Sequence, residues 1–333
     1  MTDSVAILGA GAWGTALAVH WRRTAQPPSL RLWTRNVEHA QAISAARENA
    51  RYLPGIALPE GIDAVADLAD AVGGASLIVV ATPIGALVEV VSGLKGLTLA
   101  PVLWLGKGFV ETDAAPGVAL AHRVIAPMWP APIGAISGPS FAEEVASGLP
   151  TALSVAMTDR RVADDIAARL RSQTLRVYVS DDLTGIEVGG AVKNVLAIAA
   201  GLSDGLGFGN NARAALITRG LAETGRLSEA LGGKRETLMG LAGLGDLVLT
   251  CTGDMSRNRR VGIALAQGRS LPTILAELGH VAEGVAAARA THALQAATGV
   301  NLPICEGVYR VLHEGLPPRR AVETLLTREP GRE

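Results

Sequence analysis

The feature that most constrains this chain is a glycine-rich turn near its start. The apolar run Val5–Leu8 leads directly into Gly9-Ala10-Gly11-Ala12-Trp13-Gly14, and a helical pattern follows. In a strand–turn–helix unit of this kind, Gly9 allows the tight turn, Gly11 lets the backbone approach a pyrophosphate, and Gly14 permits close packing of helix on strand. The N–H groups and dipole of the helix N-terminus favour a bound anion. The pattern predicts a dinucleotide site at the start of a parallel sheet.

Short apolar runs rich in β-branched residues alternate with helical patterns through the first half of the chain. Such alternation is typical of a parallel sheet covered by helices on both faces. The charges of Ala163–Leu170 fall on one side of a 3.6-residue period, which predicts a helix there. The predicted strands lie near Val5–Leu8, Leu30–Trp33, Leu77–Ala81, Val102–Leu105, Ile133–Ser137, Ala152–Ala156 and Arg176–Val179.

Strand signals stop after Asp182, and only helical patterns separated by glycine-rich turns remain. We therefore expect two domains. The first, residues 1–182, is predicted to be an α/β domain with a Rossmann-type doubly wound sheet that binds NAD(P). The second, residues 183–333, is predicted to be an all-α C-terminal domain that carries substrate and catalytic groups. No Pro- or Ser-rich linker separates them, so they should pack closely.

The composition narrows the choice of partner and compartment. The 333 residues include 30 Lys+Arg and 31 Asp+Glu, with 3% aromatic residues, a balance that argues against nucleic acid as a partner. The two cysteines, Cys251 and Cys305, fit a reducing compartment and are expected to be buried thiols. Asp3 precedes the first apolar run, and prolines interrupt the longest uncharged span, from Val124 to Glu143. We expect a cytoplasmic protein with no secretory signal and no membrane insertion.

The segment after the second predicted strand bears on the choice of cofactor. An acidic residue at this point would bind the ribose 2′-hydroxyl of NAD, but this chain has Trp33-Thr34-Arg35-Asn36. Arg35 could pair with a 2′-phosphate, and no carboxylate is present to repel that group. The sequence therefore predicts that NADP(H) is accepted. The alternative is that Arg35 is a solvated surface residue.

Polar groups also follow the next three strands, where ligands of open α/β sheets bind. These segments are Thr82-Pro83, Gly106-Lys107-Gly108 and Gly138-Pro139-Ser140. Lys107 stands between glycines and could reach a bound anion, or it could simply remain in water. Ser140 and Glu143 have the spacing of a capping box, which predicts that Ser140 caps a helix beginning at Phe141. That helix N-terminus would itself attract an anion.

A lysine interrupts an otherwise uncharged apolar segment, residues 188–202, with the sequence VGGAVKNVLAIAAGL. Lys193 must either extend to the surface or be held by partners, because an unpaired buried ammonium is costly. If it is held, it is a candidate general acid–base, and Asn194 offers an amide beside it. Asp246, in the stretch Gly243-Leu244-Gly245-Asp246, could pair with such a lysine.

A basic cluster, Ser256-Arg257-Asn258-Arg259-Arg260, opens a further helical pattern. Ser256 suits the N-cap position, and Arg257 with Asn258 in the first turn would form a donor-rich site for a phosphate. Cations at a helix N-terminus oppose the dipole, so the cluster costs stability unless an anion binds. We interpret this unfavourable placement of cations as a sign that the cluster binds an anion. The alternative is a basic turn that is simply solvated.

Together these segments resemble bacterial-type NAD(P)-dependent glycerol-3-phosphate dehydrogenase over nearly the whole chain. The resemblance implies reversible reduction of dihydroxyacetone phosphate to sn-glycerol 3-phosphate for glycerophospholipid synthesis, in a homodimer. The matching motifs are GAGAWGTALA at 9–18, GKG at 106–108, SGPSFAEEVA at 137–146, VKNVLAIAAGLSDGLGFGNNARAALITRGLAE at 192–223, GLAGLGDLVLTCT at 240–252, SRNRR at 256–260 and VAEGV at 281–285.

The resemblance also implies roles for single residues. Lys193 would be the proton donor and acceptor, assisted by Lys107, Asn194, Asp246 and Thr250. Ala12 and Gly106 depart from the family pattern, which often has serine and threonine there. The implied cofactor contacts are Gly9, Gly11, Ala12, Trp13, Gly14, Arg35, Lys107, Ala142, Arg257, Val281 and Glu283. The implied substrate contacts are Lys107, Gly138, Ser140, Lys193, Asp246, Ser256, Arg257 and Asn258.

Two other functions compete with this interpretation. Another two-domain hydroxy-acid dehydrogenase would need a carboxylate site in place of the basic cluster. A non-catalytic NADP(H)-sensing protein would leave Lys193 and Asp246 idle. No metal is expected in any of these functions, because the six histidines lack ligand spacing: His20, His39, His122, His280, His292 and His313.

Overall fold

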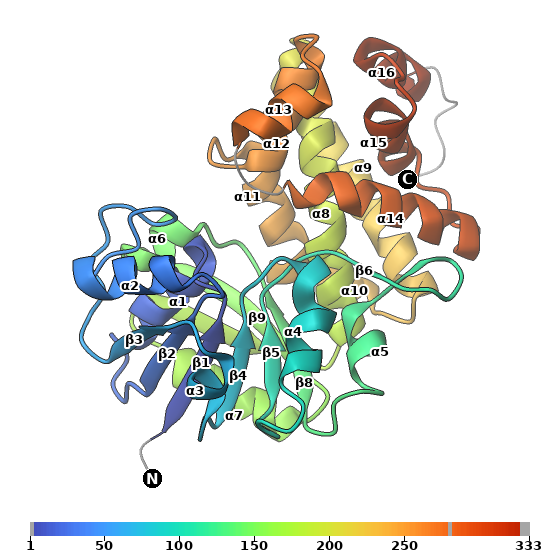
Figure 1. Cartoon of the computed structure of the whole chain (residues 1–333). Helices are drawn as coiled ribbons and strands as arrows, with labels where there is room; N and C mark the ends of the chain where they lie inside the picture. Colours follow the sequence, from blue (N-terminus) through green and yellow to red (C-terminus); the bar gives the residue numbers. More distant parts are fainter. Residues whose placement is uncertain (1–2, 279–281, 327–333) are drawn as a thin grey trace.

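The structure is a computed structural model that describes residues 3–278 and 282–326. A sheet flanked by helices forms the first half of the chain, and a group of helices stands above one edge of that sheet (Figure 1). The strand order is β10-β9-β8-β5-β4-β1-β2-β3. The strands are β1 (Ser4–Leu8), β2 (Ser29–Trp33), β3 (Ile62–Val65), β4 (Leu77–Val80), β5 (Val102–Trp104), β8 (Ile133–Ser137), β9 (Thr151–Met157) and β10 (Leu175–Val179).

The seven predicted strands are present, but two predictions about the sheet were wrong. β3 was not expected, because its four residues, IDAV, form a short run that includes a charge; in the structure only Ile62 of this strand is buried. The pairing of β8 with β9 is antiparallel, whereas the other pairs are parallel. Between these strands the chain forms the short helix α6 (Ala142–Ala146), which packs on α1 (Ala12–Trp21) beside the carboxyl edge. The chain therefore enters β9 from the edge at which β8 ended.

Helices cover both faces of the sheet, because the strands are apolar on both sides. Val5 and Ile7 pack in one core with α1 and α7 (Arg160–Leu170), and Ala6 and Leu8 pack in the other. The predicted helix Ala163–Leu170 is thus confirmed, with three more residues at its start. The other elements of this half are α2 (Val37–Ala46), α3 (Leu68–Val72), η1 (Ile84–Ala86), α4 (Leu87–Gly93), the hairpin strands β6 (Val110–Glu111) and β7 (Val118–Ala119), and α5 (Ala121–Ile125).

The order of the strands reverses between β1 and β4. From β1 the chain adds β2 and β3 on one side, and it then crosses to add β4, β5 and β8 on the other. In doubly wound sheets the ligand crevice lies beyond the carboxyl ends of the strands at such a reversal. The predicted Rossmann-type α/β sheet followed by a helical part is confirmed, and the glycine turn lies at the reversal.

The helical half is built around α8 (Leu183–Gly205). Asp182 caps this helix by accepting from the Gly185 N–H at 2.8 Å. Among the described residues α8 is the one helix long and apolar enough to cross a bilayer, and the apolar window is entirely buried within the protein. Cys251 and Cys305 are buried free thiols, as predicted. Around α8 lie α9 (Gly209–Ala230), α10 (Arg235–Leu238), the π-helix η2 (Leu241–Gly245), α11 (Asp246–Thr252), α12 (Arg257–Ala266), α13 (Leu271–Leu278), α14 (Glu283–Thr298), α15 (Pro303–His313) and α16 (Pro318–Leu326).

Candidate active site

The three glycines of the turn have different surroundings. Gly9 has φ 125°, and a Cβ there would lie 2.8 Å from the carbonyl carbon of Ala81. A Cβ on Gly14 would lie 2.1 Å from the carbonyl oxygen of Gly9, so the start of α1 can pack on β1 only with glycine at this position. A Cβ on Gly11 would meet nothing within 4 Å. The open face of Gly11 is therefore the point at which a ligand can approach the backbone.

The groups around this open face fit a dinucleotide. Gly11 is the N-cap of α1 and has no side chain to occupy the first-turn N–H groups, which begin at Ala12. The Thr82 hydroxyl, just beyond β4, is buried and has no hydrogen-bond partner among the described residues. An anion at the helix N-terminus and a polar ligand atom at Thr82 would satisfy both features. The chain thus has the donors that a bound pyrophosphate requires.

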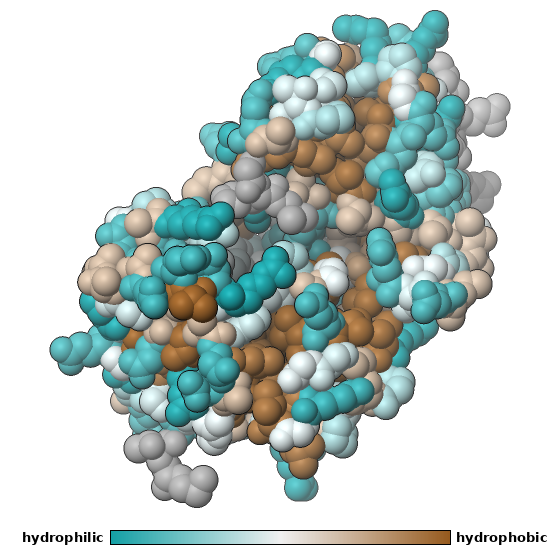
Figure 2. Space-filling model, viewed as in Figure 1, coloured by the Kyte–Doolittle hydropathy of each residue, from teal (hydrophilic) through white to brown (hydrophobic). Residues whose placement is uncertain are grey.

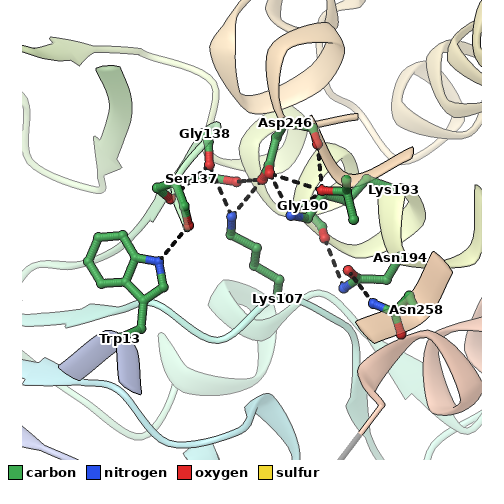
Figure 3. A network of polar contacts seen from close by, with 11 residues as sticks. Trp13, Lys107, Ser137, Gly138, Gly190, Lys193, Asn194, Asp246 and Asn258 are labelled. Atoms are coloured by element: carbon green, nitrogen blue, oxygen red, sulfur yellow. Dashed lines mark hydrogen bonds and ion pairs between the residues drawn. The ribbon is translucent and has the colours of Figure 1, made fainter. Parts of the chain in front are cut away.

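Trp13 and Ala142 join the glycine turn to the segment that follows β8. The Trp13 indole Nε1 donates to the Ser140 carbonyl oxygen at 3.1 Å (Figure 3). Ala142 is buried with Ala16 at the contact between α6 and α1. The predicted capping role of Ser140 was wrong: its hydroxyl donates to the Gly138 carbonyl at 3.0 Å, and Phe141 is the N-cap of α6. Gly138 has φ 140°, a backbone conformation that favours glycine.

Arg35 lies apart from the other predicted site residues. It is exposed beyond the end of β2, and β1 and β4 separate β2 from the strand that leads to Lys107. The next residue, Asn36, for which no role was predicted, caps α2 by accepting from the His39 N–H at 2.6 Å. The position of Arg35 matches the far, adenosine end of a dinucleotide laid across the reversal point.

Lys193 is held by partners and does not extend to the surface. Its ammonium donates to Asp246 Oδ1 at 2.5 Å and to Thr250 Oγ1 at 3.0 Å. Lys107 donates to the other oxygen of the same carboxylate, Asp246 Oδ2, at 2.6 Å, and to the Gly138 carbonyl at 3.3 Å (Figure 3). Two lysines from the two halves of the molecule therefore share one buried carboxylate.

The charges of Lys107, Lys193 and Asp246 together favour proton transfer. Burial lowers the pKa of Lys193 to about 8, against the attraction of Asp246 and assisted by the positive charge of Lys107. Burial also opposes ionisation of Asp246, but the charges of Lys107 and Lys193 outweigh it and hold the pKa of this carboxyl below its usual range. The site thus contains a carboxylate and an ammonium that can lose its proton near neutral pH.

Local structure places Asp246 opposite the lysines. The glycine-rich stretch before it forms the π-helix η2, and π-helical turns of this kind are frequent at functional sites. α11 begins at Asp246, and the Thr250 hydroxyl one turn later donates to the Asp246 carbonyl at 2.6 Å. Ser137, which was not singled out from the sequence, adds a hydroxyl 3.4 Å from Asp246 Oδ2. Its position at the carboxyl end of a predicted strand is the feature of the sequence that could have identified Ser137 as a site residue.

The basic cluster differs in part from its prediction. Ser256 caps α12 as expected, and Arg257 is exposed. Arg259, however, pairs with Asp204 at 2.8 Å and with Asp254 at 2.9 Å, so the protein itself neutralises one cation of the cluster. The exposed Arg257 and Arg260 remain beside the N-terminus of α12.

Asn258 also differs from its prediction, because its side chain is turned inward. The amide donates to Asn194 Oδ1 at 2.9 Å (Figure 3). Asn258 Oδ1 accepts from the Gly284 N–H at 3.1 Å. This link fixes the start of α14 against α8. The neighbouring Glu283 has a pKa raised by burial, opposed by the charge of Arg257. Val281 lies outside the described residues.

The site therefore joins residues from both halves. In the space-filling view the surface is hollowed where the two halves meet (Figure 2). The residues present would suit a dinucleotide at the glycine turn, proton transfer at the lysine pair with Asp246, and an anion at the N-terminus of α12. No cluster of three or more His, Cys, Asp or Glu side chains that could hold a metal occurs within the described ranges. These features are those of a dinucleotide-dependent oxidoreductase.

Comparison with known proteins identifies the family. A model of the NAD-dependent glycerol-3-phosphate dehydrogenase N-terminus matches residues 4–163, and the model of the C-terminus of the same family matches residues 182–323. The chain belongs to this NAD(P)-dependent family.

Full-length relatives and solved structures agree with the family models. The glycerol-3-phosphate dehydrogenase [NAD(P)+] of Dechloromonas aromatica is 54% identical over 332 residues, covering 99% of each chain. The crystal structure of glycerol-3-phosphate dehydrogenase from Coxiella burnetii is 44% identical, with a TM-score of 0.93 over 98% of this chain and 99% of that one. The yeast glycerol-3-phosphate dehydrogenase structure is 29% identical, with a TM-score of 0.83 over 98% of this chain and 99% of that one.

Proposed function

We propose that this chain catalyses the reversible NAD(P)H-dependent reduction of dihydroxyacetone phosphate to sn-glycerol 3-phosphate. The observation that carries the proposal is the buried lysine pair bridged by Asp246, with Lys193 2.5 Å and Lys107 2.6 Å from its two oxygens. A buried ammonium whose pKa is lowered to about 8 costs stability. A non-catalytic sensing protein would gain nothing that offsets this cost, whereas a proton-transferring enzyme would.

The reaction needs a hydride for the carbonyl carbon and a proton for the carbonyl oxygen. When bound, the nicotinamide of NAD(P)H supplies the hydride. The Lys193 ammonium donates the proton to the substrate oxygen, and in the opposite direction the Lys193 amine takes it back. Asp246 and Thr250 hold the Lys193 nitrogen, and Asn194 lies beside it on α8. Lys107 adds a second positive charge for the developing alkoxide.

The substrate phosphate is proposed to bind at the N-terminus of α12. Arg257 is exposed there, and Ser256 caps the helix. Because the side chain of Asn258 is committed to Asn194 and Gly284, its contribution to the anion would come from its backbone N–H. Holding the phosphate at a distance from the reacting carbon positions the ketone for hydride transfer. Gly138 and Ser140 would border the substrate from the β8 side.

The proposed cofactor contacts follow the glycine turn. They run from Arg35 at the adenosine end to Lys107 and Glu283 near the lysine pair, with Trp13 and Ala142 between. We also propose that residues 1–182 and 183–333 are the two domains, that the protein is a cytoplasmic homodimer, and that its product supplies glycerophospholipid synthesis.

The test is the fall in absorbance at ~340 nm, the usual wavelength for reduced nicotinamide, when protein, NADPH and dihydroxyacetone phosphate are mixed. Dihydroxyacetone without phosphate is the control substrate. We expect oxidation that depends on the phosphate, is lost in Lys193→Ala, and has a raised KM in Arg257→Lys. Tight NADPH binding with no oxidation of NADPH or NADH would instead support the sensing function. Inorganic phosphate should compete with the substrate, which it would not do for a hydroxy-acid dehydrogenase.

A further inference from the structure

A buried carboxylate beneath the lysine pair has no role in the mechanism above. Glu187 lies on α8, two turns before Lys193, with its side chain 3% exposed. Its Oε1 accepts from the His122 N–H at 3.0 Å, and its Oε2 lies 2.6 Å from His122 Nδ1. His122 belongs to α5 and is 20% exposed, so this hydrogen-bonded pair runs from the surface into the interface between the two halves.

A small cavity continues from Glu187 toward the catalytic groups. Its lining includes Glu187, Gly190, Lys107 and Ser137, together with apolar residues of β5 and β8. Gly190 lies one turn of α8 beyond Glu187, and the space that its Cβ would take is bordered by Ser137 Oγ at 3.1 Å and Lys107 Cγ at 3.4 Å. The cavity is of a size that holds a single water, with polar groups on both sides to bind it.

The far end of this cavity is lined by Lys107 and Ser137, which connect it to the proton donor Lys193 through Asp246. Lys107 and Ser137 both contact Asp246 Oδ2, and Asp246 Oδ1 contacts Lys193. This route runs between the sheet and α8.

We propose that His122 and Glu187 are the entry of a proton relay that recharges Lys193 after each ketone reduction. This inference rests on the proposed function. Once Lys193 has given its proton to the substrate oxygen, a proton passes from Lys107 through the Asp246 carboxyl to the Lys193 amine. Lys107 regains a proton across the cavity through Glu187, whose carboxyl takes a proton from His122 Nδ1 as it gives one to Lys107. His122 then takes a proton from solvent, so each cycle consumes one solvent proton and leaves the relay unchanged.

The charges around Glu187 suit this role. Burial raises its pKa above the usual range, opposed by His122 and by Arg123. A raised pKa makes the protonated carboxyl more accessible, and an imidazole can give up a proton at one ring nitrogen while it takes another at the second. A purely structural cap of α5 would need neither property.

The test uses His122→Asn, whose side-chain amide can still donate to Glu187 but cannot carry a proton. With enzyme and NADPH in excess over dihydroxyacetone phosphate, the single-turnover rate should match wild type, because Lys193 begins protonated. The steady-state kcat should fall by about tenfold or more, the range of a lost proton-transfer step. Imidazole added to His122→Ala should restore kcat.

The matched control is His292→Asn. His292 Nδ1 lies 2.7 Å from Glu306 Oε2 between α14 and α15, so the same type of pair is removed elsewhere, and kcat should not change. Glu187→Gln provides a second relay variant if His122→Asn fails to fold, as judged by thermal unfolding. An unchanged kcat, or equal losses in single-turnover rate and kcat without imidazole rescue, would overturn the relay alone. A wild-type protein that does not reduce the ketone would remove both proposals.

Discussion

Replacing Asp246 by asparagine removes the charge that the two lysines share while keeping the shape of the side chain. In the wild type, Asp246 is 1% exposed and its oxygens lie 2.5 Å from Lys193 Nζ and 2.6 Å from Lys107 Nζ. The asparagine oxygen can still accept from one lysine, but no anion remains to balance two ammonium groups. The attraction that opposes deprotonation of Lys193 is lost, while burial and the charge of Lys107 remain. The pKa of Lys193 must therefore fall further below about 8.

The size of the effect follows from the burial of the pair. Breaking a buried ion pair by removing one partner costs about 3–5 kcal/mol, and one pH unit corresponds to about 1.4 kcal/mol. If about 3 kcal/mol favours the neutral amine, the midpoint of the ammonium titration moves down by about 2 pH units. At pH 7 the ammonium population then falls from about nine-tenths to about one-tenth, so kcat/KM for ketone reduction should be about tenfold lower.

The assay is the ratio of kcat/KM for dihydroxyacetone phosphate in Asp246→Asn and wild type, measured from pH 5 to pH 9. Titration of the substrate itself cancels in this ratio. We expect a ratio near one at pH 5 that falls through neutral pH and levels off above the wild-type midpoint near pH 8. Thermal unfolding at each pH separates loss of activity from loss of structure. A ratio that does not vary with pH, in a folded variant, would refute the assignment of Asp246 as the group that sets the pKa of Lys193.

Three further sets of substitutions test the glycine turn, the role of Arg35 in cofactor choice and the stability cost of Lys193. Gly14→Ala places a Cβ 2.1 Å from a backbone oxygen and should lower the free energy of unfolding by about 3 kcal/mol, whereas Gly11→Ala, with open space at its Cβ, should change stability little and weaken NADPH binding. Equal unfolding temperatures for the two variants would contradict this contrast. Arg35→Ala should lower the ratio of kcat/KM for NADPH over NADH by about tenfold, the value of one charged hydrogen bond, and an unchanged ratio would remove Arg35 from cofactor choice. Lys193→Met removes a buried ammonium while Lys107 still neutralises Asp246, so it should raise stability by about 1 kcal/mol and abolish turnover. A lower unfolding temperature for Lys193→Met would count against a stability cost at this site.

Features that depend on neighbouring residues were predictable from the sequence. The glycine turn is an example, because the backbone angle at Gly9 and the contact between Gly14 and Gly9 arise within six residues. The N-cap role of Ser256 is another, since its hydroxyl accepts from the N–H of Arg259 three residues later. The same reasoning failed for Ser140, because the turn at Gly138 offered its hydroxyl a nearer carbonyl oxygen.

Features that depend on distant pairing were not predictable. β3 is only four residues long and carries a charge, and it forms because β2 offers an edge to pair with. The reversed direction of β9 follows from the packing of α6 against α1. Arg259 resembles Arg257 in sequence, yet only the fold brings Asp204 within 2.8 Å of it and leaves Arg257 exposed.

The sequence by itself determined that this chain forms a dinucleotide cradle followed by a helical part, and that Lys193 needs a partner. Both conclusions follow from local geometry and from the cost of burying a charge. Which partner Lys193 has was decided only by the tertiary structure, since Asp246 is 53 residues away and Lys107 comes from the other half of the molecule. Charges act through space, so their effects on pKa depend on distances that exist only in the folded chain.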